Sequence, residues 1–299
     1  MTSADLDRDA APTVVGVDVG GTTIKARLFD GSAEVVGEWR VATPSGDLDA
    51  SGTIRAVAEI VDAARRLRPV AAVGLAVPGV VDDEAGVAVA SFNLGWRDLP
   101  LRDLLSSQIG LPVGFGQDVR AGALAESTTG AARDVPGGMA FVAIGTGLAS
   151  AFVQGGTALV SGGWAGEIGQ VVLRHGALAG LRVEEVASAG GLARRLGAAN
   201  AREAAERVRA ADPRAVALWN DAVEVLADTL SWIAAVAAPE MIVVGGGLAE
   251  AGDLLFDPLR RALDERLAFS RRPTLARAAH GDAAAIVGAG VLARTALLP

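Results

Sequence analysis

The sequence predicts an α/β protein built from two similar halves. Val-rich apolar runs with few polar breaks, typical of buried strands, alternate with segments whose apolar residues recur at helical spacing. Each half opens with a strand, a turn of Gly and Thr, and a second strand, at residues 13–30 and again at residues 139–156. This alternation is typical of mixed sheets that are covered by helices.

The composition fits a globular chain and argues against several partners. The 299 residues are 51% hydrophobic and 21% charged, which is enough to bury the cores of about two domains. A net charge of −8 argues against nucleic acid or an anionic membrane as a partner. The absence of Cys excludes disulfides and thiolate metal sites.

We also expect a cytoplasmic protein. The residues before Thr13 lack the basic and apolar regions of a secretion signal, so we interpret residues 1–12 as a disordered tail. The long uncharged stretch 135–166 is interrupted by Gly pairs, Gln154, Ser and Thr. It therefore does not resemble a membrane-spanning helix, which needs about 20 predominantly apolar residues.

In the first half we expect the order βββαβαβ, with a three-stranded meander at its start and a turn-rich segment that ends at Trp96. The expected strands are 13–19, 24–30, 34–44, 70–79 and 112–116, and the expected helices are 53–67 and 101–110.

In the second half the pattern recurs, and the joint lies near Asp118. Helices are expected from Val119, near Val183, after Asp212 with Pro213 at the first helical position, from Asp257-Pro258, and over 281–297; a buried strand is expected at 241–247. The predicted domains are a small one over 13–118, a large one over 119–281, and a final helix, 282–299, that packs back on the first domain.

Three glycine-rich turns are candidate phosphate sites. They are Asp18–Thr23, Gly145-Thr146-Gly147 and Gly245-Gly246-Gly247. Glycine lets the backbone approach a ligand closely, and exposed N–H groups beside a hydroxyl form an anion-binding concavity. The alternative is that these glycines only make tight hairpins. Their repetition at equivalent places in two halves favours phosphate binding.

Two other nucleotide motifs are excluded. A Walker A loop needs Gly-Lys-Ser/Thr, but the one lysine in the chain, Lys25, follows Ile24. A GxGxxA pattern at Gly288–Ala293 lies near the end of the chain without the strand and acid of a dinucleotide site, so we interpret it as a small-residue face of a helix.

Asp118 is the candidate catalytic acid. An apolar strand delivers it to the start of a helix, where the helix N-terminus favours the ionised carboxylate that a general base requires. The alternative is a structural N-cap, for which Asp is a favoured residue.

Together these motifs resemble the ROK family (repressor, open reading frame, kinase) of sugar kinases from Thr13 onward. The similar segments are Asp18–Thr22, Gly74–Asp82 (GLAVPGVVD), Ser91–Trp96 (SFNLGW), Gln117–Glu126, Ile144–Gly147, Gly166–Gly169 (GEIG) and Val243–Leu248.

The resemblance implies a two-domain actin-like ATPase fold (hexokinase or ribonuclease H-like), with duplicated βββαβαβα halves and an interdomain cleft. It implies an ATP- and Mg²⁺-dependent kinase that phosphorylates a hydroxyl of a hexose, with O6 of glucose as the default. N-acylhexosamines, a catalytically weak sugar sensor and polyphosphate as donor remain alternatives. Sugar and ATP are then the expected ligands, in an enzyme of carbohydrate metabolism such as glycolysis, and a homodimer is the expected assembly.

The same resemblance implies the roles of single residues. Asp118 is the base on the sugar hydroxyl, and Asp18 holds Mg²⁺ through water. The sugar contacts are Gly79, Asn93, Gln117, Asp118, Glu167, Gln170 and Glu184. The ATP contacts are Gly20, Gly21, Thr22, Thr23, Lys25, Gly145, Thr146, Gly147, Gly246 and Gly247. For Lys25 a solvated strand position is an alternative, and for Glu184 an ordinary acid in the first turn of a helix.

The sequence departs from the family at its zinc motif. Gln170 stands in the place of the usual His, and His175, Ala177 and Arg182 stand in the places of three cysteines. A tetrahedral zinc site needs four ligands, so we expect no zinc site and a loop that is held by packing alone.

Overall fold

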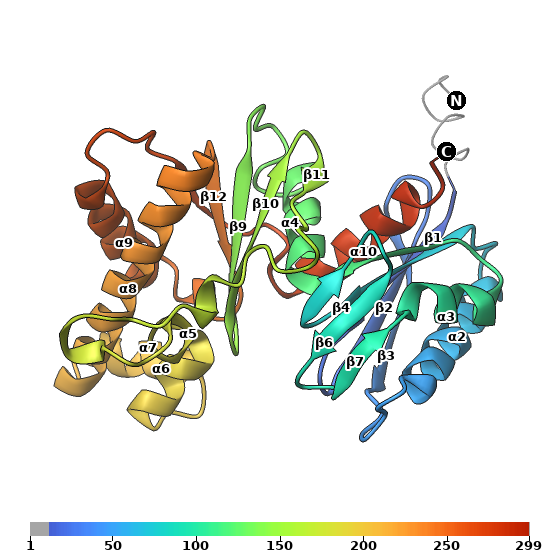
Figure 1. The fold of residues 1–299 in the computed structure, drawn as a ribbon, viewed down its shortest axis with the longest axis horizontal. Coiled ribbons are helices and arrows are strands. Elements are labelled where there is room, and N and C mark those ends of the chain that lie inside the picture. Colours follow the sequence, from blue (N-terminus) through green and yellow to red (C-terminus); the bar gives the residue numbers. More distant parts are fainter. Residues whose placement is uncertain (1–11, 299) are drawn as a thin grey trace. The chain divides into compact units, whose positions relative to one another are not determined.

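The computed structural model describes residues 12–298, and it divides them into two compact units. Unit 1 comprises the chain up to Ala125, residues 160–165 and residues from 283 onward; unit 2 comprises 126–159 and 166–282 (Figure 1). The sequence placed the joint near Asp118, whereas the units divide seven residues later, within the helix that Asp118 begins. The expected tail at 1–12 lies outside the described residues except for Pro12.

Unit 1 is built on a five-stranded mixed sheet. Its order is β3-β2-β1-β4-β8, in which β1, β4 and β8 are parallel to one another and β2 pairs antiparallel with both β1 and β3. The strands are β1 (Val14–Val19), β2 (Thr23–Phe29), β3 (Val35–Ala42), β4 (Ala72–Val77) and β8 (Val113–Gln117).

Helices cover both faces of this sheet. The expected helices are α2 (Ser51–Arg65) and α3 (Leu101–Ile109), and their apolar side chains form one core with Val15, Val17 and Val19 of β1. The last helix, α10 (Ala284–Thr295), covers the opposite face, where Val14 packs with Ala293 (Figure 1). Alternate residues of one buried strand therefore serve two cores.

The turn-rich segment before Trp96 is a small sheet, which the sequence analysis missed. It consists of β5 (Val80–Asp82), β6 (Val87–Ser91) and β7 (Trp96–Leu99), all antiparallel. Strands of three to five residues with Asp and Gly between them show too little alternation to stand out.

Unit 2 repeats the main sheet. Its order, β11-β10-β9-β12-β13, again places two antiparallel strands beside three parallel ones. The strands are β9 (Met139–Ile144), β10 (Leu148–Gln154), β11 (Thr157–Ala158), β12 (Met241–Gly245) and β13 (Thr274–Arg277). The α/β class and the repetition of the sheet that the sequence predicted are thus present.

Helices of unit 2 pack on one face of this sheet, against Ala140, Val142 and Ile144. They are α5 (Val183–Ala187), α6 (Ala189–Leu196), α7 (Ala201–Arg209), α8 (Pro213–Ala237) and α9 (Asp253–Arg266). Helix α4 (Asp118–Thr128) joins the two units, and short 3₁₀ turns lie at 168–170, 176–178, 249–251 and 281–283. Among the described residues, no helix has both the length and the apolar character needed to cross a bilayer.

Two predicted helix starts had different outcomes. Asp212 caps α8 by accepting hydrogen bonds from the N–H groups of Arg214 and Ala215, as expected. The helix expected from Asp257-Pro258 instead begins at Asp253, so the prediction was wrong and Pro258 lies inside α9. Pro258 has no N–H to donate to the Leu254 carbonyl, and that carbonyl instead accepts the indole N–H of Trp219 at 3.2 Å.

Candidate functional site

The carboxyl edge of the unit 1 sheet gathers the residues predicted to bind phosphate and sugar. The strands β1, β4 and β8 are parallel neighbours, so their carboxyl ends meet at one edge. The turn Gly20–Thr22 follows β1, Gly79 follows β4, and Asp118 follows β8. Ligands of open α/β sheets bind at this edge.

The first glycine turn is held in shape by its neighbours while its tip stays exposed. The N–H of Gly20 donates to the carbonyl of Thr23 at 2.9 Å, and Thr43 bonds both the Gly20 carbonyl (2.7 Å) and the Thr22 carbonyl (3.1 Å). Gly21 and Thr22 are exposed. A fixed turn with an open tip suits a backbone that is to meet an anion.

Asn93 lies beside this turn. It is exposed in the loop between β6 and β7, and a Cβ built on Gly21 would lie 3.7 Å from the Asn93 Cβ. Gly79 fixes the start of the same small sheet, because its φ is +110° and a Cβ there would lie 2.2 Å from the Ala90 carbonyl oxygen. The small sheet therefore brings a sugar-binding candidate to the phosphate turn.

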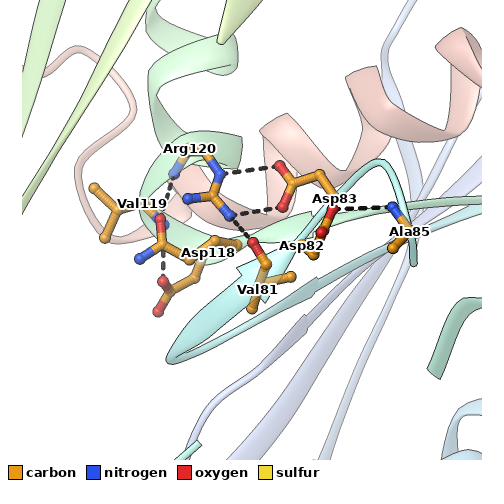
Figure 2. A network of polar contacts seen from close by, with 8 residues as sticks. Val81, Asp82, Asp83, Ala85, Asp118, Val119 and Arg120 are labelled. Atoms are coloured by element: carbon orange, nitrogen blue, oxygen red, sulfur yellow. Dashed lines mark hydrogen bonds and ion pairs between the residues drawn. The ribbon is translucent and has the colours of Figure 1, made fainter. Parts of the chain in front are cut away.

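Asp118 is not the N-cap of its helix. It is the first residue of α4, and its Oδ1 accepts the N–H of Val119 at 2.8 Å (Figure 2). The side chain that accepts from within the first turn is Gln117, whose Oε1 takes the N–H of Arg120 at 3.3 Å. Gln117 is 3% exposed, whereas Asp118 is only partly buried. Asp118 therefore begins the helix with a carboxylate that is partly buried.

Two charged residues that the sequence analysis missed support this junction. Arg120 is 1% exposed, and its Nε and Nη2 donate to the two oxygens of Asp83 at 3.0 and 2.7 Å (Figure 2). Its Nη2 also donates to the Val81 carbonyl. Burial raises the pKa of Asp83, while the Arg120 guanidinium acts in the opposite direction. Since the pair is separated by 37 residues, no local pattern reveals it.

Asp18 and Lys25 face each other across β1 and β2. They are register partners, with Lys25 Nζ 3.9 Å from Asp18 Oδ2, and the Asp18 side chain is 14% exposed. Burial raises the pKa of Asp18, and the charge of Lys25 lowers it by less. Lys25, 33% exposed, is therefore the counter-ion of Asp18. The sequence predicted only an ATP contact or a solvated strand position for this lysine.

Asp18 fits a Mg²⁺ ion that keeps most of its water. Mg²⁺ is commonly bound through one or two carboxylates together with the phosphates of a substrate. Within residues 12–298, no group of three or more His, Asp or Glu side chains gathers into a metal site. These residues therefore do not form a metal site made of protein ligands alone, but Asp18 can contact a Mg²⁺ ion through water.

In unit 2, two glycine turns lie at the carboxyl ends of the neighbouring strands β9 and β12. The turn Gly145–Gly147 is held by Ser188, whose hydroxyl donates to the Thr146 carbonyl at 3.0 Å, while Thr146 and Gly147 are exposed. Gly246, with φ +83°, packs against the end of β9, where a Cβ would lie 2.6 Å from the Ile144 carbonyl. Ser188 also caps α6. Its role as a cap could have been predicted from the sequence Ser-Ala-Gly-Gly at the start of that helix.

A cavity of about 830 Å³ opens beside both turns, and all of its lining residues belong to unit 2. Thr146, Gly247 and the N-terminal residues of α6 and α7 line it, together with Arg194, Arg202 and Arg209. The cavity is large enough for a nucleotide, and its lining has more basic than acidic residues although the whole chain is acidic. The glycine turns and the arginines thus fit the phosphates of ATP.

The predicted sugar segment of unit 2 is also close to the second phosphate turn. Glu167 is partly buried before the 3₁₀ turn at 168–170, Gln170 is exposed, and Glu184 lies in the first turn of α5. Glu184 Oε2 would lie 3.1 Å from a Cβ on Gly147. The prediction that packing alone holds the following loop was wrong, because Arg182 pairs with Glu184, Glu185 and Gln170.

Comparison with known proteins gives concordant results along the whole chain. The model of the ROK family matches residues 14–296. A glucokinase of Halalkalibacterium halodurans is 31% identical, with 94% of each chain covered. An N-acetyl-D-glucosamine kinase of Haemophilus influenzae is 30% identical, over 93% of this chain and 98% of that one. A crystal structure of a ROK family glucokinase from Streptomyces griseus, in complex with glucose and AMPPNP, superposes with a TM-score of 0.79 at 27% identity, covering 95% and 99% of the two chains.

Proposed function

The chain belongs to the ROK family, and from that premise we propose that it is an ATP-dependent sugar kinase. The acceptor is a hydroxyl of a hexose, O6 of glucose by default. The observation that carries the proposal is the edge of the unit 1 sheet, where parallel strands deliver Gly20–Thr22, Gly79 and Asp118 to one place and Asn93 lies beside Gly21. The fold expected for such a kinase, the actin-like ATPase fold, is that of the ROK structures to which the chain is similar.

In the proposed mechanism, Asp118 accepts the proton of the attacking sugar hydroxyl. Phosphoryl transfer gains most of its rate from positioning and charge stabilisation, so a carboxylate of ordinary basicity suffices. Asn93, Gln117, Glu167, Gln170 and Glu184 orient the sugar through hydrogen bonds, since amides and carboxylates pair well with neighbouring hydroxyls. The buried Arg120–Asp83 pair fixes the strand-to-helix junction that carries Asp118.

The nucleotide is assigned to the glycine turns and to the unit 2 cavity. The turns Gly20–Thr23 and Gly145–Gly147 contact phosphate, Lys25 balances the charge of Asp18, and Gly246 and Gly247 leave room for the adenosine. Mg²⁺, held by Asp18 through water, supplies charge neutralisation on the phosphates when it is bound. Among the described residues of this cavity, neither Arg194 nor Arg202 forms a side-chain hydrogen bond or ion pair, so both are candidates for a phosphate contact. Arg194 Nη1 would lie 3.2 Å from a Cβ on Gly190.

An N-acylhexosamine is the second candidate substrate. It is supported by the relative named as an N-acetyl-D-glucosamine kinase, which is nearly as similar to this chain as the glucokinase is. A cytoplasmic homodimer that acts in carbohydrate metabolism is part of the same proposal. Sedimentation of the purified chain tests the dimer.

A coupled assay of ADP release tests the proposed function. The panel comprises glucose, mannose, N-acetylglucosamine and N-acetylmannosamine, with ATP or polyphosphate as donor. Asp118→Asn is expected to lower kcat by roughly 10²–10⁴-fold, the usual contribution of a general base, while the sugar still binds. Asp134→Asn, an exposed carboxylate outside the site, is the matched control. Sugar-induced thermal stabilisation without any phosphoryl transfer would instead support the sensor alternative.

A further inference from the structure

The side chain of Arg182 connects two residues to which the proposed function assigns sugar contacts. Its Nη1 donates to Gln170 Oε1 at 2.8 Å and lies 2.9 Å from Glu184 Oε1. We propose that Arg182 is a positioning residue that sets the affinity for the sugar by fixing the orientation of Gln170 and Glu184. This proposal rests on the proposed function, because that function makes Gln170 and Glu184 ligands of the substrate.

Arg182 determines which polar atoms of Gln170 and Glu184 are left to bind the sugar. A guanidinium only donates hydrogen bonds, so it engages the amide oxygen of Gln170 and leaves the amide NH₂ group to be presented as a donor. On Glu184 it engages Oε1, while Oε2 lies on the side of Gly147 in the second phosphate turn. One cation thereby presents a donor from Gln170 and an acceptor from Glu184, a combination that suits a pair of sugar hydroxyls.

The backbone holds Arg182 in place independently of its side chain. Arg182 forms an antiparallel bridge with Val172, and the N–H of Val183 donates to the Val171 carbonyl at 2.9 Å. Glu185 accepts the backbone N–H of Arg182 at 2.7 Å and so caps α5. Shortening the Arg182 side chain therefore removes its contacts with Gln170, Glu184 and Glu185 but leaves the backbone bridge to Val172 and the cap of α5 in place.

The exposure of these groups favours a role in orientation over a role in stability. The Arg182 side chain is 42% exposed and that of Glu184 is 18% exposed. Ion pairs that are open to solvent contribute little to folding, and salt screens them. The fixed direction of Gln170 and Glu184 is the larger effect, because misplaced substrate ligands weaken the binding of the substrate without unfolding the protein.

The test is the kinetics of Arg182→Met and Arg182→Lys with the best sugar of the panel. We expect Arg182→Met to raise the KM for the sugar about tenfold, the equivalent of about one hydrogen bond to a charged group, while the KM for ATP and kcat change by less than about threefold. Lysine keeps the charge but cannot bridge two acceptors in one plane, so Arg182→Lys is expected to recover only part of the affinity. Arg174→Met, which removes an exposed arginine of the same loop, is the matched control.

A double-mutant cycle adds a readout that a merely structural residue would not change. If Arg182 acts through Gln170, then Arg182→Met is expected to have a smaller effect in a Gln170→Ala background than in the wild type. A sugar KM within twofold of the wild type, or equal increases in the KM for the sugar and the KM for ATP, overturns the proposal.

If the wild-type chain phosphorylates no sugar, the proposed function fails, and the clamp is then tested by hydrogen exchange of segment 168–171. Faster exchange there in Arg182→Met than in Arg174→Met supports the clamp, and equal exchange refutes it.

Discussion

Asp83 holds Arg120 beside the junction that carries Asp118. Arg120 lies two residues after Asp118 and donates two guanidinium N–H groups to the Asp83 carboxylate (Figure 2). Arg120 is fully buried, and its Nη1 has no hydrogen-bond partner among the described residues, so the charge depends heavily on Asp83. Breaking one partner of a buried pair leaves the other charge uncompensated.

We therefore predict that Asp83→Ala lowers the free energy of unfolding by about 3 kcal/mol, the usual cost of orphaning a buried charge. In the fraction that stays folded, kcat is expected to fall about 10²-fold because Asp118 is displaced. Asp103→Ala, which breaks an exposed ion pair with Arg102, is the control and should change neither quantity. Urea unfolding measures the free energy of unfolding, and the ADP-release assay measures kcat. Equal values of both quantities in Asp83→Ala and Asp103→Ala would show that Asp83 does not support the site.

The burial of Asp18 leads to a prediction about pH. Because burial raises the pKa of Asp18, the folded chain holds this proton more tightly than the unfolded chain does. Stability contributed by the neutral carboxyl is present at low pH and is lost as the pH rises through the raised pKa. At neutral pH the buried charge is thus a net cost, which a bound Mg²⁺ ion would offset.

Asp18→Asn removes that charge and is predicted to raise the Tm at pH 7 while strongly reducing kinase activity. The difference in Tm between the variant and the wild type should close as the pH falls to about 4, near the ordinary pKa of Asp. Lys25 loses its partner, but at 33% exposure this costs little. Thermal unfolding from pH 3 to pH 8 measures the effect; a variant less stable than the wild type at pH 7 would contradict it.

At the scale of elements, the sequence predicted those features that depend on interactions between residues close together in the chain. The two hairpins, the cap of α8 by Asp212 and the glycine turns all depend on neighbours in sequence, and the sequence identified them. Pro258 was misread because the Leu254 carbonyl, which it leaves without a helical partner, is bonded by Trp219, 35 residues before Leu254 in the chain. The same applies at the site: the Arg120–Asp83 pair depends on a contact across 37 residues, and Arg182 on a loop whose register only the fold sets.

The packing of α10 yields a prediction of its own. Gly16, Gly74 and Gly114 are register neighbours on three parallel strands, and the helix backbone lies directly against them. A Cβ on Gly74 would lie 1.7 Å from the carbonyl oxygen of Ala289. In the helix itself, a Cβ on Gly288 would lie 1.8 Å from the Ala121 carbonyl oxygen and one on Gly290 would lie 2.9 Å from the Phe29 ring, so the GxGxxA pattern lies on a packing face, as predicted.

Gly74→Ala is accordingly predicted to destabilise the protein by about 3 kcal/mol, the upper part of the range for overpacking, because backbone atoms on both sides must shift. Gly138→Ala is the matched control, since its nearest atom is 3.7 Å away at ordinary contact distance. Urea unfolding compares the two. If Gly74→Ala proves as stable as Gly138→Ala, α10 is free to move away from the sheet.

At the scale of the whole molecule, the two units share a sheet order but carry different parts of the chemistry. Both have two antiparallel strands followed by three parallel ones, and in both a glycine turn follows the first strand. Unit 1 adds two candidate acids, Asp18 and Asp118, to this edge, whereas unit 2 adds a cavity with three arginines. Two sheets of the same order thus carry different groups: two carboxylates in unit 1, and in unit 2 a cavity lined by three arginines and two acids.

This division predicts how ligands protect the chain from hydrogen exchange. Adenosine, which has no phosphate, should protect only segments that line the unit 2 cavity, namely 145–147, 189–202 and 247–251. ATP with Mg²⁺ should add protection at 18–23, because that turn is assigned to phosphate and Asp18 to the ion. Asp118→Asn serves as the control, since it is expected to lose turnover and to keep both patterns. Protection of 18–23 by adenosine alone would mean that the base binds in unit 1, and the assignment of the cavity would have to be abandoned.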